Sequence, residues 1–184
     1  MKKITLFSAV FLCVLMNLPA QDSRAAFAMN HYATRNFIAG ALSAAELDTV
    51  LQAGIRAPSA RNRQPWHFTV VRNQALAKQI VPDIADGNVL IIVSASGDGK
   101  TNGAEILDCG LAAESIYLAA QAIGLGSRIY TGPIDAVNRS LKRDLELPAG
   151  YSAVVLVRVG KVQQVDAASA ASSRKAASAL VTYK

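Results

Sequence analysis

The pattern of hydrophobic and polar residues divides most of the chain into alternating helices and strands. Apolar residues at helical spacing follow a capping-box pair, Ser43 and Glu46, and the aliphatic run 89–93 is typical of a strand buried on both faces. The predicted helices span residues 43–55, 74–80, 103–123 and 133–145, and the predicted strands start at residue 66 or span 89–93, 127–130 and 154–159. This length and order indicate one domain.

The first residues have a different pattern. Lys2 and Lys3 precede the apolar run Ile4–Met16, and a polar segment with small residues follows. This layout predicts a secretory signal peptide within residues 1–25, cleaved near residue 20 or 25, because the apolar run is too short for a comfortable membrane span. Residues 26–184 are then expected to be a single exported domain, periplasmic or secreted.

Charge and cysteine content narrow the function classes. The formal net charge is +6, and two of the positive charges belong to the predicted signal peptide. The remaining basic residues are spread over several segments, which argues against a dedicated nucleic-acid face. Cys109 is the single cysteine outside the leader, so an intrachain disulfide is excluded and the fold must depend on its core.

The segment Arg56–Phe68 joins the first predicted helix to the first strand. Pro58 prevents the helix from continuing, and Ser59, Asn62 and Gln64 place three hydrogen-bonding side chains close together before the sole tryptophan, Trp66. Such a segment is typical both of a polar connecting loop and of a ligand-binding loop, and its composition alone leaves both interpretations open.

The residue pattern of this loop resembles that of a known family. The pattern A-P-S-x-x-N-x-Q-P-W, followed by an aliphatic strand, is similar to the signature of the nitroreductase family, flavoproteins that hold FMN at a homodimer interface. Residues Asp108–Gly132 also resemble that family's central helix and its G-L-G-S turn. The resemblance covers roughly Asn30–Tyr183 and implies an α+β fold, with a mixed, mainly antiparallel sheet flanked by helices and a long central helix in a homodimer.

The resemblance also implies a set of cofactor-binding residues. His31-Tyr32-Ala33-Thr34-Arg35 falls where the family grips the FMN phosphate, but His31 replaces a usual arginine and Ala33 a usual serine. Thr131 and Gly132 fall where the family presents backbone N–H groups to the flavin N5. The implied FMN-contacting residues are His31, Tyr32, Ala33, Arg35, Pro58, Ser59, Ala60, Asn62, Gln64, Thr131, Gly132 and Arg174.

The predicted helix 103–123 carries a stripe rich in small residues, including Cys109, Gly110 and Ala113. Such a stripe suits a close contact with a second copy and equally a helix buried in its own core. Cys109 is most simply a small buried hydrophobe.

The C-terminal tail is rich in alanine and serine, a composition typical of a flexible end. The resemblance instead implies that Arg174 returns to the phosphate and that Leu180–Tyr183 is an arm on the partner subunit. Within the tail, Asp166–Ser172 is similar to the motif on which flavin transferases attach FMN, with Ala170 in place of a glycine. Covalent attachment at Ser172 is therefore a hypothesis.

Other chemistry has little support, because the chain has only two histidines and shows no Ser/His/Asp triad, paired carboxylates or metal-ligand spacing. The sequence and the resemblance together thus predict an FMN-dependent oxidoreductase that reduces small acceptors such as nitroaromatics or quinones by ping-pong transfer. The donor would be NAD(P)H or a membrane-derived reductant. Two alternatives stay open: an exported flavin-binding electron carrier with no dedicated substrate, and a structural protein without flavin.

Overall fold

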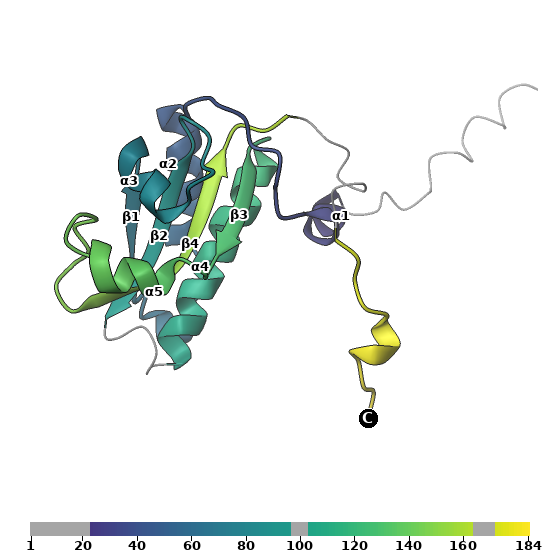
Figure 1. The fold of residues 1–184 in the computed structure, drawn as a ribbon. Helices are drawn as coiled ribbons and strands as arrows, with labels where there is room; N and C mark the ends of the chain where they lie inside the picture. Colours follow the sequence, from purple (N-terminus) through teal and green to yellow (C-terminus); the bar gives the residue numbers. More distant parts are fainter. Residues whose placement is uncertain (1–22, 97–102, 164–171) are drawn as a thin grey trace, which may run out of the picture. The chain divides into compact units, whose positions relative to one another are not determined.

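A computed structural model describes residues 23–96, 103–163 and 172–184 (Figure 1). The chain divides into two units, Met1–Asn30 and His31–Lys184. The described part of the first unit is helix α1 (Ser23–Asn30), and most of the predicted signal peptide lies outside the described residues. Among the residues that are described, no helix is both long and apolar enough to cross a bilayer.

The second unit contains an antiparallel sheet with helices on both faces. Its main helices are α2 (Ala44–Ile55), α3 (Gln74–Ile80), α4 (Gly103–Ala122) and the short α5 (Ile134–Ala136), and its strands are β1 (Trp66–Val71), β2 (Val89–Ser96), β3 (Gly126–Tyr130) and β4 (Tyr151–Gly160). Short helical turns span Ala60–Asn62, Val137–Leu141 and Ala177–Ala179. The four described strands lie in the order β1-β2-β4-β3, and every neighbouring pair is antiparallel. The expected α+β class and mainly antiparallel sheet are confirmed.

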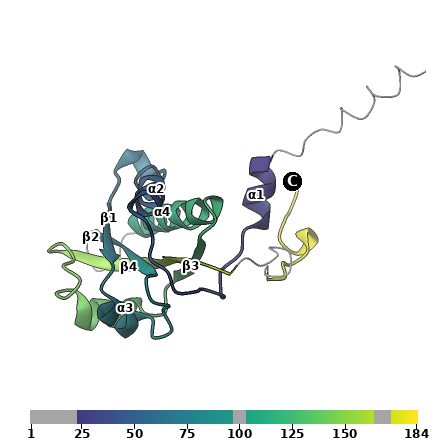
Figure 2. The ribbon, with the colours of Figure 1, turned by 90° about the horizontal axis from the view of Figure 1, so that it is seen from above.

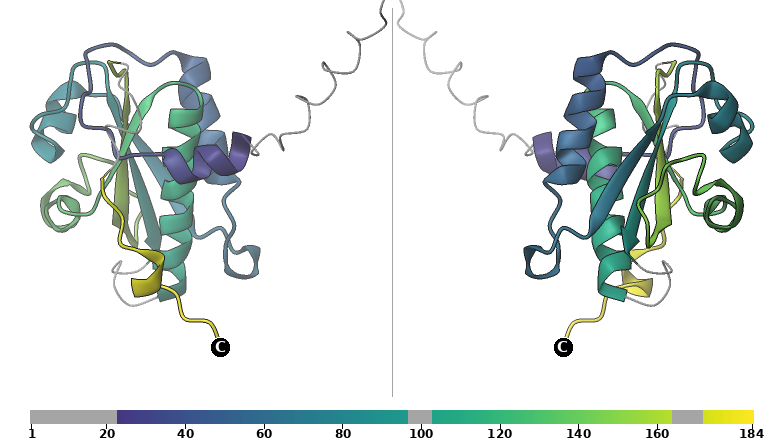
Figure 3. Two further views of the ribbon diagram at one scale, coloured as in Figure 1. Left: turned by 90° about the vertical axis from the view of Figure 1, so that its right-hand side faces the viewer. Right: turned by 90° about the vertical axis from the view of Figure 1, so that its left-hand side faces the viewer.

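Helices α2 and α4 cover one face of the sheet and α3 and α5 pack against the other (Figure 2, Figure 3). Alternate residues of β2 divide between the two cores. Ile91 and Val93 pack under α4, while Leu90 and Ile92 face the opposite layer. The central strand is therefore buried on both faces, as its unbroken aliphatic run predicts.

Helix α2 packs closely against α4 because one of its residues has no side chain. A Cβ built on Gly54 would lie 2.8 Å from the Ile116 side chain of α4, a distance that real Cβ contacts do not reach. At the other end of α2, Ser43 and Glu46 form the predicted capping box. The helix is thus fixed at its start by a cap and at its end by close packing, and its end delivers the loop before β1.

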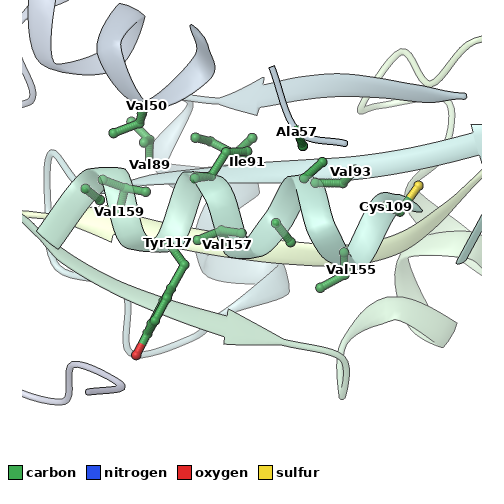
Figure 4. Close-up of a cluster of buried hydrophobic side chains, with 14 of the residues drawn as sticks. Val50, Ala57, Val89, Ile91, Val93, Cys109, Tyr117, Val155, Val157 and Val159 are labelled. Carbon is green, nitrogen blue, oxygen red and sulfur yellow. The ribbon is translucent and has the colours of Figure 1, made fainter. Parts of the chain in front are cut away.

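The small-residue stripe of α4 lies mostly in the chain's own core. Cys109 (Figure 4), Ala113 and Ile116 are fully buried in the core cluster that α4 shares with the sheet and α2, whereas Gly110 is exposed. Burial first, and the neighbouring carboxylates second, raise the pKa of the Cys109 thiol to about 12. Cys109 is therefore a packed hydrophobe, not a reactive thiol.

The predicted helix 133–145 differs from the structure. Its α-helical part is only Ile134–Ala136, and a π-helical turn, Val137–Leu141, follows. The Asn138 side chain exchanges hydrogen bonds of 2.9 and 2.8 Å with the backbone of Ala153, and Lys142 donates to the Tyr151 carbonyl at 2.9 Å. These contacts hold the segment against the start of β4, and periodicity along the sequence does not predict such cross-links.

Candidate functional site

The loop Pro58–Gln64 has a constrained backbone. Arg61, Asn62 and Gln64 all have positive φ angles, of 55°, 55° and 48°, in the left-handed region. This conformation costs on the order of 1–2 kcal/mol for Arg61 and Gln64 and less for Asn62, whose short polar side chain tolerates it. Ser59 Oγ accepts the Gln64 N–H at 3.0 Å, and Asn62 Oδ1 accepts from Gln64 Nε2 at 3.1 Å. The polar side chains of the loop therefore hold its turn together.

A contact from α4 anchors this loop. Asp108 Oδ1 accepts the Ala60 N–H at 3.0 Å, and the Asp108 side chain is only 1% exposed. Asp108 was not among the residues predicted from the sequence to have a role. A signal was available, because Asp108 lies eight residues before Ile116 on the same side of the predicted helix, and a carboxylate on a buried side needs a hydrogen-bond donor.

The segment His31–Arg35 is held along β3 and the C-terminal half of α4. The Gln121 side chain donates to the Tyr32 carbonyl at 2.9 Å and accepts the Tyr32 N–H at 3.3 Å. Thr34 and Ser127 exchange two further hydrogen bonds, of 3.0 and 3.1 Å. Ala33 and Arg35 remain exposed.

His31 lies in a cluster of polar groups around Tyr117. The two rings are edge to face with centroids 5.4 Å apart, and His31 Nε2 is 3.9 Å from Glu114 Oε1. Tyr117 points away from the aliphatic side chains under α4 (Figure 4). Burial is the main cause that raises the pKa of Tyr117, and a hydrogen bond with Gln121 lowers it. The charge of Glu114 raises this pKa further, whereas the charge of Arg174 lowers it. Arg174 therefore lies within electrostatic range of this cluster.

The residues after β3 leave their backbone accessible. Thr131 and Gly132 are exposed, and no atom lies within 4 Å of a Cβ built on Gly132. The Thr131 carbonyl accepts the Ile134 N–H at 3.1 Å, which fixes the turn into α5. A planar ligand can approach this turn without meeting a side chain.

The predicted covalent site is described only in part. Residues 166–171 of the D-x-x-S-A-A-S motif lie outside the described residues, whereas Ser172 is described and exposed. The Ser172 carbonyl accepts from the Arg174 guanidinium at 2.7 Å. The Ser172 hydroxyl is thus close in the chain to a cation suited to phosphate.

The strand order separates the predicted site residues into two groups. We call Pro58–Gln64 the loop half-site, and His31–Arg35 with Thr131, Gly132 and Arg174 the strand half-site. The loop half-site precedes β1, whereas His31–Arg35 and Thr131-Gly132 of the strand half-site flank β3 at the opposite edge of the sheet. Three inter-strand steps of about 4.8 Å separate the two edge strands by roughly 14 Å. One chain therefore presents two half-sites at different edges.

Comparison with known proteins agrees with this fold. The model of the nitroreductase family matches residues 28–89 and 84–161. A protein of Archaeoglobus fulgidus, provisionally named an NADH dehydrogenase/NAD(P)H nitroreductase, is 32% identical over 129 residues, which are 65% of this chain and 74% of that protein.

Solved structures of similar fold include two with FMN. A nitroreductase with bound FMN from Desulfitobacterium hafniense has a TM-score of 0.71 and 23% identity, covering 87% of this chain and 97% of that one. A provisionally named nitroreductase in complex with FMN from Desulfovibrio desulfuricans has a TM-score of 0.71 and 26% identity, covering 87% and 95%. With its loop signature, its sheet order and these matches, the chain belongs to the nitroreductase family.

Proposed function

We propose that this protein is an FMN-dependent oxidoreductase that reduces small acceptors such as nitroaromatics or quinones. The observation that carries the proposal is the match of the family model to residues 28–161, which contain the whole loop half-site and most of the strand half-site. Two similar structures carry FMN, and the Archaeoglobus relative is named for NAD(P)H-linked activity.

The residues of the two half-sites fit FMN. Arg35 and Arg174 are exposed cations suited to a phosphate, and the open backbone at Thr131-Gly132 leaves room for a flat ring. When bound, FMN supplies the hydride and electron transfer, and the chain supplies binding and orientation. The loop half-site contributes hydroxyl and amide side chains toward the ring.

A homodimer would complete the site. Because the half-sites of one chain lie at opposite edges of the sheet, we propose that each FMN contacts the strand half-site of one copy and the loop half-site of its partner. The C-terminal segment supports this arrangement, because Leu180 is 65% exposed and Tyr183 is 92% exposed. Apolar side chains so exposed suit an arm that packs on a second subunit.

The phosphate contacts differ from the family pattern at His31 and Ala33. The His31 side chain lies beside the Glu114 carboxylate and Tyr117, so the family's guanidinium is replaced by an imidazole ring that contacts other groups. We propose that the phosphate is therefore held mainly by Arg35 and Arg174.

Native-state mass spectrometry tests the cofactor and the dimer together. We expect a dimer that carries one FMN per subunit, with a yellow colour that bleaches on reduction. A colourless monomer that takes up no added FMN would overturn the proposal.

The second candidate is an exported flavin-binding electron carrier, favoured by the predicted signal peptide. Nicotinamide cofactors are cytoplasmic, so an exported enzyme would use a membrane-derived reductant in preference to NAD(P)H. Stopped-flow measurement of flavin reduction separates the alternatives. Slow bleaching by NADH and NADPH is expected for the exported protein, whereas saturable bleaching at micromolar concentrations would favour a nicotinamide-linked reductase.

Covalent attachment of FMN at Ser172 is a separate hypothesis, supported by the motif and by the nearby Arg174. It predicts an intact-mass increase after co-expression with a flavin transferase. Ser172→Ala should abolish the increase, and an adduct that persists in this variant would reject Ser172 as the site.

A further inference from the structure

Asp108 is a buried carboxylate with one partner in the loop half-site. Its Oδ1 accepts the Ala60 N–H at 3.0 Å, and its side chain is 1% exposed in the second turn of α4. Within the described part of the chain, its other oxygen, Oδ2, is buried and has no hydrogen-bond partner. A carboxylate in this position is expensive to bury, so a role for it is to be expected.

The hydrogen bond from the Ala60 N–H to Asp108 links the loop to helix α4. Ser59 and Asn62 both bond to Gln64, and the Asn62 and Arg63 N–H groups bond to carbonyls of Ser59 and Ala60. Among the described residues, all of these hydrogen bonds stay within the loop. They shape the turn but do not fix its position on the domain, whereas Asp108 ties it to a rigid helix.

The backbone of the loop makes such an anchor necessary. Arg61, Asn62 and Gln64 are left-handed, so the observed turn competes with lower-energy conformations of the same residues. Ala57, just before the loop, is buried in the core, and Trp66, just after it, packs against the same core. The ends are therefore fixed by packing, and the centre is fixed by the Asp108 contact.

We propose that Asp108 is a positioning residue that holds the loop half-site in the conformation that receives the flavin ring. This inference rests on the proposed function, because it assumes that the loop contacts FMN. It assigns Asp108 no direct contact with the cofactor. Its effect should be equal for FMN and riboflavin, since the loop would face the ring and not the phosphate.

The carboxylate acts here as a hydrogen-bond acceptor. Asparagine keeps an acceptor oxygen for the Ala60 N–H and removes the buried charge, whereas alanine removes the acceptor. Cys109→Ala is the matched control, because Cys109 is the adjacent residue, is fully buried in the same helix and makes no contact with the loop half-site in the described hydrogen bonds.

The test measures the loop first without any flavin. Amide hydrogen exchange at Ala60 should be slow in the wild type, in Asp108→Asn and in Cys109→Ala, and fast in Asp108→Ala. Flavin affinity is then measured by fluorescence titration. We expect Asp108→Ala to weaken FMN and riboflavin by the same factor, about 10- to 100-fold, and Asp108→Asn to stay within about threefold of wild type.

A variant of Ala60, the donor in this hydrogen bond, keeps the test decisive if Asp108→Ala does not fold. Ala60→Pro removes the N–H donor, and the extended backbone of Ser59, with φ −142° and ψ 154°, suits a residue before proline. In this background, Asp108→Asn should give no change in flavin affinity, and Ala60→Pro alone should reproduce the equal loss for both flavins.

The results separate this inference from the proposed function. A wild-type protein that binds no flavin overturns the function, while Ala60 exchange still reports on the anchor. A wild type that binds FMN, together with an Asp108→Ala variant of unchanged affinity and a protected Ala60 amide, overturns the positioning role. A loss confined to FMN would also overturn it, because the effect would then concern the phosphate.

Discussion

The loop half-site and the strand half-site are fixed by different kinds of contact. The loop depends on its own side chains and on one buried carboxylate, Asp108, from another element. The strand half-site is held by the Tyr32 backbone, which bonds to the Gln121 side chain, and by Thr34, whose N–H and Oγ1 both bond to the Ser127 backbone, while Arg35 stays exposed. The loop can therefore change little without losing its shape, whereas the exposed positions of the strand half-site, such as Ala33, can vary. The departure from the family pattern at Ala33 falls at such an exposed position.

The largest expected effect distinguishes residues that bind the flavin phosphate from residues that contact the flavin ring. Arg35→Ala and Arg174→Ala should each weaken FMN binding by about 1.5–3 kcal/mol more than riboflavin binding, because riboflavin has no phosphate for a charge-assisted bond. Parallel titrations with both flavins measure this. Arg139→Ala, an exposed arginine of the π-helical turn, is the control. Equal losses for the two flavins would show that Arg35 and Arg174 are not phosphate ligands.

Loss of the Gln121 hydrogen bonds that hold the strand half-site should give the next largest effect. Gln121→Ala deletes two hydrogen bonds to the Tyr32 backbone and one of 3.0 Å to Ser127 Oγ, so the free energy of unfolding should fall by about 2 kcal/mol. Urea unfolding measures the change. Ser115→Ala removes only a bond within α4, to the Leu111 carbonyl, and should change stability by less than about 0.5 kcal/mol. An equal change in the free energy of unfolding of the two variants would show that the Gln121 hydrogen bonds do not stabilise the strand half-site.

A milder change tests the loop half-site. Asn62→Ala removes the acceptor for Gln64 Nε2 and places alanine at φ 55°, so both flavins should bind more weakly by about 1 kcal/mol. Arg63→Ala, at an ordinary φ of −72° in the same loop but outside the implied FMN-contacting residues, should leave both affinities unchanged. If Asn62→Ala affects FMN alone, the division between ring and phosphate contacts is wrong.

The smallest effect concerns an ion pair between helix α2, which delivers the loop, and residue 161 after β4. Lys161 Nζ lies 2.6 Å from Glu46 Oε1, and this hydrogen bond is the main cause that holds the Glu46 pKa at about 2, below its ordinary value of 4.5. The pair's stabilisation is therefore fully present above about pH 4.5 and is lost as the pH falls toward 2. The partly exposed pair should contribute less than about 1 kcal/mol.

Unfolding at pH 6 and pH 2.5 measures this contribution. Glu46→Gln keeps a capping-box residue but removes the charge, so it should destabilise the protein at pH 6 and have a smaller effect at pH 2.5. Asp86→Asn, which breaks the more exposed pair with Lys78, is the control and should change little at either pH. If Glu46→Gln destabilises the protein more at pH 2.5 than at pH 6, the expected loss of the ion pair's stabilisation at low pH is wrong.

Local patterns predicted the elements of this domain well. The capping box at Ser43, the helix Gln74–Ile80 and the buried strand from Val89 all lie where the sequence places them. These features depend on residues a few positions apart, so propensity and spacing are sufficient. The π-helical turn at Val137–Leu141 was missed, because it depends on contacts with β4 that are distant in sequence.

The site was predicted as a set of residues without an arrangement. The loop signature and the segment His31–Arg35 were identified from their residue types, and their roles as FMN contacts remain predictions. Their separation into two half-sites was not visible, because strand order places β1 and β3 at opposite edges of the sheet. Asp108 and Gln121 were not assigned roles, since each acts on a segment 48 or 89 residues away.

The sequence by itself determined the family, the elements and the polar residues available for a flavin, because those properties reside in short runs of the chain. The tertiary structure alone decided which of these residues share an edge, and which buried side chain fixes the loop. Hydrogen bonds such as Asp108–Ala60 and Gln121–Tyr32 join residues far apart in the chain, and they form only once sheet order and helix packing have brought those residues together.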